Sequence, residues 1–218
     1  NTTTANTFNT AVGYNAGVAV TTGIYNTFIG GICGDSAQTV SYSTLVGGNM
    51  STGDTSSDNC NGLGYGINAV SGYTTIGIGI NDIRAQHGNI TWATVSDERY
   101  KKDIVDSTAG LAFINALQPR TWKYKTLGEL PETFRAYEAD STKVFKNTQT
   151  NHGFIAQEVK AAIDADDSIK DGFRLWDDRP DGSQEVAEAA LIPVLVKAIQ
   201  EQTALITTLT DRITALEG

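Results

Sequence analysis

The stretch Asn26-Thr27-Phe28-Ile29-Gly30 is one copy of a short unit that recurs through the first part of the chain. Three further full copies and one shortened copy are Asn9-Thr10-Ala11-Val12-Gly13, Ser43-Thr44-Leu45-Val46-Gly47, Cys60-Asn61-Gly62-Leu63-Gly64 and Thr74-Thr75-Ile76-Gly77. The glycines of the four full copies are 17 residues apart. A fixed period of this length indicates stacked structural repeats. Units so short and so rich in turn residues predict one strand plus turns in each copy.

One such unit cannot bury its apolar face alone. Stacked in one chain, the units make a narrow β-coil, whereas three chains side by side can bring their apolar faces together on a common axis. The pattern is similar to the trimeric β-roll or β-prism stalks of fibrous adhesins and phage fibres, and we predict such a stalk over residues 1–95. The alternatives are a monomeric β-solenoid and a disordered Gly/Ser linker, and the regular Val/Ile/Leu-Gly steps argue against the linker.

The composition changes near residue 95. Residues 1–95 are rich in Gly, Thr, Asn and Ser and contain no proline, whereas residues 96–218 carry most of the charged residues and all four prolines. This change predicts a second domain over 96–218, with a mixed α+β fold. Its expected elements are helices over 108–117 and 156–163, strands over 121–125, around Phe154 and over 173–177, and a turn at Pro180-Asp181-Gly182.

The end of the chain shows a seven-residue repeat. The positions of this a/d seam are Ile192, Leu195, Ile199, Gln202, Ile206, Leu209, Ile213 and Leu216. Ile at a and Leu at d over about four heptads predict a coiled coil from about 190 to 217, with Gln202 as a polar layer that sets the register. This pattern alone favours parallel dimers, so a homotrimer also requires the other domains. The alternative is an amphipathic helix that packs on its own domain.

Charge and composition exclude several classes of protein. The net charge of -9 argues against a nucleic-acid partner, since such proteins need a basic surface. No apolar run approaches the roughly 20 residues that span a bilayer, so no membrane insertion is expected. Two cysteines and two histidines without metal-ligand spacing predict no metal site and no cofactor, and Cys33 and Cys60 are expected to be buried thiols.

The segment Ser96-Asp97-Glu98-Arg99-Tyr100-Lys101 lies at the predicted boundary. Taken alone it is typical of a charged helix start, with Ser96 or Asp97 as the N-cap. Three further motifs follow it in order: Gly110-Leu111-x-Phe113-Ile114-x-Ala116-Leu117-x-Pro119, Gly153-Phe154-Ile155-Ala156-Gln157-Glu158-Val159 and Leu191-Ile192-Pro193-Val194-Leu195-Val196-Lys197-Ala198-Ile199-Gln200-Glu201. Together these motifs resemble the peptidase S74 domain, the C-terminal intramolecular chaperone of endosialidase tailspikes and related phage fibres. The resemblance covers residues 96–218.

The resemblance implies a self-cleaving serine endopeptidase that acts once. It places the nucleophile on Ser96 and the base on Lys101, and Asp97 and Arg99 are supporting candidates. A serine hydroxyl needs a nearby base, and a lysine is a base only when neutral, a form that burial and neighbouring cations favour. Residues five apart do not share a face of a regular helix, so the pair needs an irregular turn or a lysine from another subunit.

The side of the cut stays open. Attack by Ser96 on the Val95 carbonyl passes through a five-membered ring, whereas attack on its own carbonyl requires a strained four-membered ring. In the family, cleavage is associated with the Ser-Asp step, here Ser96-Asp97. Attack between chains of a trimer could reconcile the two.

The resemblance implies the distal part of a phage tail fibre or tailspike, assembled in the host cytoplasm and carried on the virion after the chaperone is released. One alternative is a trimerisation cap that does not cleave, and another is a binding module in which residues 1–95 recognise a host cell-surface glycan or protein receptor. The remaining candidates have mainly structural explanations: a surface position for His152, packing for the tryptophans, and solvent or backbone contacts for Gln157 and Glu158. The tryptophans are Trp92, Trp122 and Trp176.

Overall fold

The computed structural model describes residues 7–170 and 173–218, so the first six residues of the predicted repeat segment lie outside it. The chain divides into two compact units, Asn1–Asp103 and Ile104–Gly218. This division falls eight residues after the compositional boundary at 95. Each unit is described by itself.

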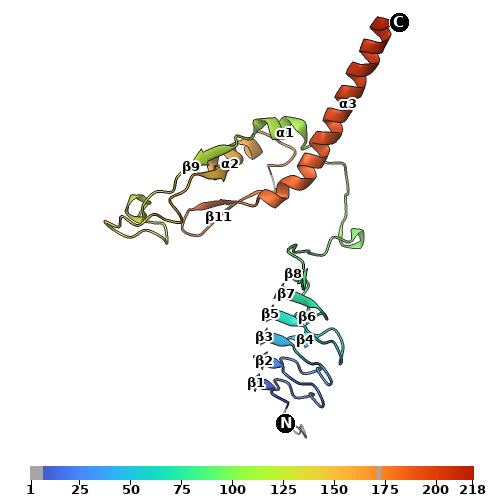
Figure 1. Cartoon of the computed structure of the whole chain (residues 1–218), viewed down its shortest axis with the longest axis vertical. Helices are drawn as coiled ribbons and strands as arrows, with labels where there is room; N and C mark the ends of the chain where they lie inside the picture. Colours follow the sequence, from blue (N-terminus) through green and yellow to red (C-terminus); the bar gives the residue numbers. More distant parts are fainter. Residues whose placement is uncertain (1–6, 171–172) are drawn as a thin grey trace. The chain divides into compact units, whose positions relative to one another are not determined.

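The first unit is a β-solenoid of about four turns (Figure 1). Its main sheet has the strand order β1-β2-β3-β5-β7-β8. The strands are β1 (Thr10–Val12), β2 (Thr27–Ile29), β3 (Thr44–Gly48), β5 (Asn61–Tyr65), β7 (Tyr73–Ile78) and β8 (Asn81–Gln86). The first five are parallel, and β8 turns back antiparallel to β7. A smaller parallel sheet pairs β4 (Ser51–Thr52) with β6 (Asn68–Ala69).

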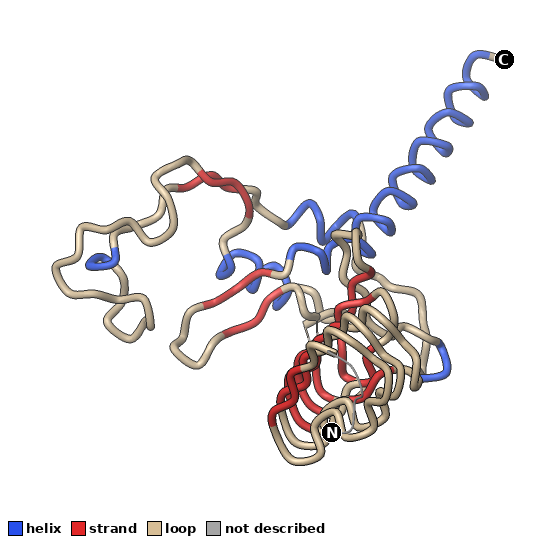
Figure 2. Tube along the Cα trace, turned by 60° about the horizontal axis from the view of Figure 1, so that its bottom comes forward, coloured by secondary structure: helices blue, strands red, loops and turns tan. Residues whose placement is uncertain are grey.

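The predicted repeat is confirmed in detail by the register. Gly47 lies opposite Gly64, and Gly64 lies opposite Gly77 of the shortened copy. Figure 2 shows the successive turns nearly superimposed along the stack. The repeated glycines have positive φ angles, +140° at Gly47, and a Cβ added there would overlap the carbonyl oxygen of Gly64 in the next turn. Glycine is therefore required because each turn approaches its neighbour through backbone alone.

The solenoid buries its own core within one chain. The inward side chains include Phe28, Leu45, Met50 and Ile67, all almost fully buried. The repeat units therefore form a β-solenoid within one chain, one of the two stacked arrangements considered above. A stalk whose core lies only between chains would leave these side chains exposed in a single chain, and they are buried. Trimer formation by this unit stays a prediction.

A polar ladder explains the first position of three copies, Asn9, Asn26 and Ser43. The backbone N–H of Asn26 donates to Asn9 Oδ1 at 2.8 Å, and that of Ser43 donates to Asn26 Oδ1 at 3.0 Å. The backbone N–H of Cys60 donates in turn to Ser43 Oγ at 2.9 Å. Each side chain thus accepts from the residue one turn later, which satisfies backbone donors that would otherwise be buried without partners.

The two thiols supply a chemical probe of this core. Cys33 and Cys60 are free and buried, and burial raises the pKa of the Cys60 thiol to about 11 and that of Cys33 above its usual range. Because the thiolate is the reactive form, we expect both thiols to resist a thiol reagent at pH 8 until the solenoid unfolds. Labelling followed by mass spectrometry tests this expectation, and labelling of folded protein at the rate of a free thiol would contradict it.

The second unit is a small mixed α/β fold. Its core joins α1 (Leu111–Ala116), α2 (Ala156–Asp164) and the start of α3 (Leu191–Glu217), and includes Phe113, Val159 and Leu175. Antiparallel two-stranded sheets pair β9 (Arg120–Trp122) with β10 (Asn151–Gly153), and β11 (Trp176–Asp178) with β12 (Gln184–Val186). The part of the chain that the structure describes also has three short 3-10 helices: η1 (Glu98–Tyr100) in the first unit, and η2 (Leu127–Glu129) and η3 (Glu188–Ala190) in the second.

Most elements predicted for this unit are confirmed, with shifted ends. The predicted helix over 156–163 is α2, and the one over 108–117 is the shorter α1. The predicted strands begin or end up to three residues from β9 and β11, and Phe154 follows β10 instead of lying in it. The Pro180-Asp181-Gly182 turn joins β11 to β12 as expected. Asp181 holds the turn by accepting from Ser183, which lowers the pKa of its carboxyl to about 2.

The C-terminal helical segment Glu188–Glu217 corrects one expectation. By length and composition alone it is apolar enough to cross a membrane, so the view that no run approaches spanning length was wrong. The sequence argument looked for an unbroken apolar run, whereas in this helix Ile, Leu, Val and Ala raise the mean hydropathy although uncharged threonines interrupt the run. One such helix is weak evidence for a membrane span, and its apolar residues are ordered in the seven-residue seam described above.

Candidate functional site: a serine and a lysine beside a short helix

The predicted pair Ser96 and Lys101 lies in one segment of the first unit. Lys101 Nζ is 2.8 Å from Ser96 Oγ and 3.0 Å from the Ser96 carbonyl oxygen, and donates to both. Both residues are exposed in the single chain. The structure therefore brings the hydroxyl and the amine within hydrogen-bond reach in the same chain, at the distance that a nucleophile and its base require.

An irregular turn produces this contact. The 3-10 helix η1 lies between the two residues, flanked by extended backbone at Asp97 (φ -69°, ψ 136°) and at Lys101 (φ -116°, ψ 151°). Asp97 is its N-cap, and its side chain accepts from the backbone N–H of Arg99. One tight turn with extended ends folds the chain back, so residues five apart meet as they would not on a regular α-helix. The capping role expected for Asp97 is thus present together with the Ser96–Lys101 contact.

The supporting candidates Asp97 and Arg99 pair with each other. Arg99 Nε and Nη2 donate to the two carboxylate oxygens of Asp97 at 2.9 and 2.7 Å. These bonds hold the pKa of the Asp97 carboxyl below its usual range, and Lys101 adds a smaller effect in the same direction. The Asp97 carboxylate is therefore matched by a bidentate guanidinium.

The predicted a/d seam lies on the exposed side of α3. Ile192 is 62 % exposed, Ile206 57 % and Ile213 55 %, whereas Leu191, Val194 and Ala198 on another face of the helix are buried in the unit's own core. The helix thus has two apolar faces, and one is used within the chain. The packing of α3 on its own domain, the alternative to the coiled coil, accounts for the buried face alone.

Two long-range pairs in the second unit were not defined by the sequence. Arg120 forms a bidentate ion pair with Glu158. Glu201 of α3 accepts from the backbone N–H of Leu111 at 2.8 Å and so satisfies a donor at the start of α1. No local pattern predicts these pairs, because the partners are 38 and 90 residues apart. His152 lies exposed on β10, opposite Thr121.

The tryptophans differ in their surroundings. Trp122 packs edge-on against Tyr124, and Trp176 donates to Gln184 and lies under the ammonium of Lys160. These contacts agree with the expected packing role. Trp92, in the first unit, is 50 % exposed.

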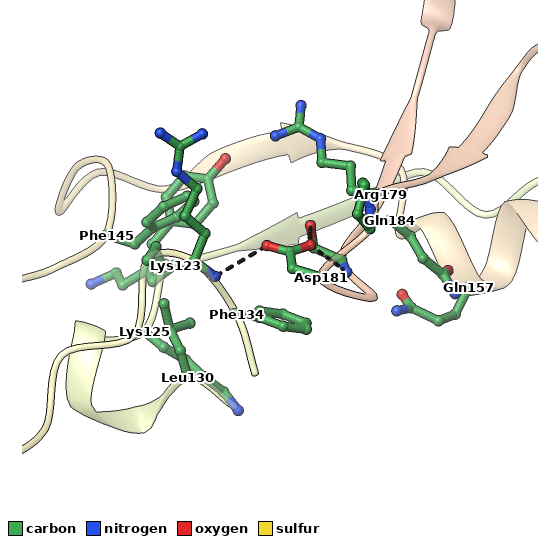
Figure 3. Close-up of a pocket in the computed structure, with 14 residues that line it drawn as sticks. Lys123, Lys125, Leu130, Phe134, Phe145, Gln157, Arg179, Asp181 and Gln184 are labelled. Atoms are coloured by element: carbon green, nitrogen blue, oxygen red, sulfur yellow. Dashed lines mark hydrogen bonds between the residues drawn. The ribbon is translucent and has the colours of Figure 1, made fainter. Parts of the chain in front are cut away.

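The second unit also contains a pocket of about 900 Å³ that sequence analysis missed (Figure 3). It is lined by Phe134 and Phe145, by the cationic residues Lys123, Lys125, Arg135 and Arg179, and by Gln157 and the Asp181 turn. Asp181 accepts from the backbone N–H of Arg135 at 3.1 Å and so joins two parts of the lining. The lining comes from five separate stretches of the chain, so no contiguous motif reveals it. Neither Ser96 nor Lys101 is among the described residues that line it.

Comparison with known proteins agrees with the ordered motifs. No curated protein and no solved structure matches the chain. One family model matches, Peptidase_S74, described as the chaperone of endosialidase, over residues 96–167. The match begins at Ser96, spans about a third of the chain and ends before β11, β12 and α3. Residues 96–167 are therefore a Peptidase_S74 chaperone-of-endosialidase domain, and they follow a β-solenoid in this chain.

Proposed function

We propose that this chain is the distal part of a phage tail fibre or tailspike, carried on the virion. Its C-terminal part would assemble three chains, guide folding of the solenoid and then cut itself off. The observation that supports cleavage is the 2.8 Å contact between Lys101 Nζ and Ser96 Oγ at the first residue of the matched domain. The likeness to a chaperone of endosialidase supports the fibre setting.

The chemistry needs one water molecule and no cofactor. Neutral Lys101 takes the proton of Ser96 Oγ while the oxygen attacks a backbone carbonyl carbon. The tetrahedral intermediate collapses, the C–N bond breaks, and the leaving amine takes the proton from Lys101. Water, deprotonated by the same lysine, then attacks the ester, and Ser96 Oγ leaves and regains a proton. The products are one carboxylate and one amine.

The first residue of the released fragment identifies the bond. Attack by Ser96 on the Val95 carbonyl of its own chain releases a fragment that begins at Ser96. Attack by Ser96 of a second copy on the Ser96–Asp97 bond releases one that begins at Asp97. The exposure of the pair in a single chain supports a requirement for assembly, because burial against other copies would favour the neutral lysine.

A pair of lysine variants tests the proposed base. We expect Lys101→Met to slow cleavage by on the order of 100-fold or more, because among the described residues Lys101 is the side chain that contacts the Ser96 hydroxyl. Lys102→Met is the matched control: it removes the adjacent exposed lysine, and cleavage should continue at the wild-type rate. Densitometry of denaturing gels over time measures both. Equal slowing by the two variants would show a general charge effect and contradict the assignment.

Trimer assembly through α3 is supported by its exposed a/d seam. In such a coil Gln202 would form a polar layer among Ile and Leu. We expect Gln202→Leu to stabilise the assembled form by roughly 1–3 kcal/mol per chain, because an amide is replaced by a buried aliphatic side chain. Thermal unfolding followed by circular dichroism, with oligomeric state measured by sedimentation, gives the comparison.

Thr207→Leu is the control for that variant, because Thr207 lies at an outer b position of the same helix. It should change the melting temperature little. If Thr207→Leu stabilises as much as Gln202→Leu, the seam is not the interface.

In the alternative, a trimerisation cap that does not cleave, the chains also assemble through the α3 seam, but Ser96 does not act as a nucleophile. Under this alternative, assembled wild-type chains stay whole.

A further inference from the structure

The segment between β9 and β10 forms most of one side of the pocket in the second unit. Residues 123–150 contain little regular structure beyond η2 and one isolated bridge. Backbone hydrogen bonds nevertheless fix the path of this segment. The N–H of Leu127 donates to the carbonyl oxygen of Lys143 at 2.8 Å, and that of Phe145 donates to the carbonyl oxygen of Lys125 at 3.0 Å. The segment therefore holds its side chains in defined positions, as the lining of a binding site requires.

Aromatic side chains of this segment surround the pocket and do not enter the core of the unit. Tyr124, Phe134 and Phe145 line the pocket of about 900 Å³, and none of them belongs to the buried cluster around α1, α2 and α3. The rings of Tyr124 and Phe145 meet edge to face with their centroids 5.7 Å apart. Figure 3 shows Phe145 on one side of the pocket and Gln157 on the other. A pocket of this volume has room for a small organic molecule.

The lining is cationic, whereas the whole chain has a net charge of -9. Its four cations are Lys123, Lys125, Arg135 and Arg179, and its one carboxylate among the described residues is that of Asp181. Isolated lysines on a surface are usually solvated and need no ligand. Here, however, the cations share a concave surface with aromatic rings, and such a surface concentrates the potential of its charges on whatever enters it. This charge favours an anionic occupant.

The positive charge of the lining is only partly matched within the chain. Arg179 donates to Glu185 at 2.6 Å, whereas no described carboxylate forms an ion pair with Lys123, Lys125 or Arg135. The four cations set against the carboxylates of Asp181 and Glu185 leave an excess of two positive charges. This excess matches an anion that carries one or two charges, and it is too small to neutralise a polyphosphate.

We propose that this pocket binds a small aromatic carboxylate. The flat ring of the ligand would lie against the aromatic lining in the offset or edge-on contacts that rings prefer. Its carboxylate would be held by the unpaired cations, of which Arg135 can offer two parallel N–H donors. Gln157 and Gln184 supply amide groups for polar substituents. Binding requires neither cleavage nor assembly, because the whole lining belongs to the second unit and contains neither Ser96 nor Lys101.

Isothermal titration of the full wild-type chain with naphthalene carboxylate tests the proposal. We expect a Kd of about 0.1–1 mM, in the range of a small ligand with good contacts. Naphthalene carboxamide has the ring without the charge, and acetate has the charge without the ring. Both should bind at least about tenfold more weakly, because each lacks one of the two matched features. If the chain cleaves itself, the C-terminal fragment keeps the entire lining, so the titration reports the same site.

These titrations can overturn the proposal without any variant. No binding of naphthalene carboxylate at millimolar concentration would do so, and so would equal binding of the carboxylate and the carboxamide. Tighter binding of inorganic pyrophosphate than of naphthalene carboxylate would assign the pocket to phosphates and overturn the aromatic carboxylate. None of these outcomes bears on the proposed cleavage, which is measured on gels.

Two double variants with matched charge place the ligand in the pocket. Lys123→Gln combined with Lys125→Gln removes two exposed cations of the lining and should raise the Kd at least about tenfold. Lys102→Gln combined with Lys143→Gln removes two exposed lysines that do not line the pocket, and the Kd should stay within about twofold of wild type. Circular dichroism checks that both chains fold. Equal weakening by the two double variants would show a general charge effect and overturn the proposal.

Discussion

A chain carrying Ser96→Ala is expected to remain whole, as a single 23.2 kDa species, after the wild-type chain has been cut. Alanine lacks the oxygen that attacks the carbonyl, and no acyl intermediate can form. Removing a nucleophile of this kind lowers the rate by on the order of 10³-fold or more. Lys101 then loses its Ser96 Oγ contact, while its contact with the Ser96 carbonyl oxygen involves backbone and remains available. Denaturing gels and intact mass over several days measure the effect.

The matched control is Ser107→Ala, since Ser107 is another exposed serine downstream of the site. It should be cut like the wild-type chain. Sedimentation should find Ser96→Ala in the same oligomeric state as uncut wild type, because α3 is unchanged. Fragments of normal size from Ser96→Ala would assign the cut to another nucleophile or to a contaminating protease.

The second large effect is expected in the solenoid, from Gly47→Ala. Gly47 has φ of +140°, and a Cβ there would overlap the backbone oxygen of Gly64 in the next turn. The left-handed backbone and the overlap together should cost roughly 2–6 kcal/mol of unfolding free energy. Since neighbouring turns stabilise one another, the damage should spread along the stack. Exposure of Cys33 and Cys60 to a thiol reagent reports unfolding of this unit separately from the rest of the chain.

Gly31→Ala provides the comparison within the same stack. No atom lies within 4 Å of a Cβ built at Gly31. Its substitution should leave both thiols protected and the unfolding free energy within about 1 kcal/mol of wild type. Similar thiol exposure in the two variants would contradict the requirement for glycine at the contact between turns.

The repeat was predictable because each turn of the solenoid makes the same backbone contacts with the next turn. Glycine every 17 residues marks the backbone contact between turns, and Asn9, Asn26 and Ser43 at the first positions of their copies supply the acceptors of the polar ladder. The location of the core was not predictable in the same way. Phe28 and Ile29 are both apolar neighbours on one strand, and hydrophobicity alone does not say which points inward. In the folded solenoid the side chain of Phe28 points inward and is buried, whereas that of Ile29 points outward and is 40 % exposed.

The sequence predicted which residues form the candidate site, but it did not predict the geometry that brings them together. Ser96 and Lys101 were named from a resemblance, and their spacing left both an irregular turn and a partner chain open. The contact in one chain depends on Asp97, which caps η1 and turns the segment back. The pocket beside Asp181 could not be foreseen, because its lining joins residues from 123 to 184 that meet only after folding. Short strands such as β9 were displaced because their ends are set by pairing with β10, and not by local propensity.

The most direct test of the proposed self-cleavage is the intact mass of purified wild-type chains after assembly, with the first residue of each fragment determined. Two fragments should replace the 23.2 kDa chain, and the C-terminal one should begin at Ser96 or Asp97. Assembled chains that keep their full mass, or a cut at another position, would contradict the roles assigned to Ser96 and Lys101.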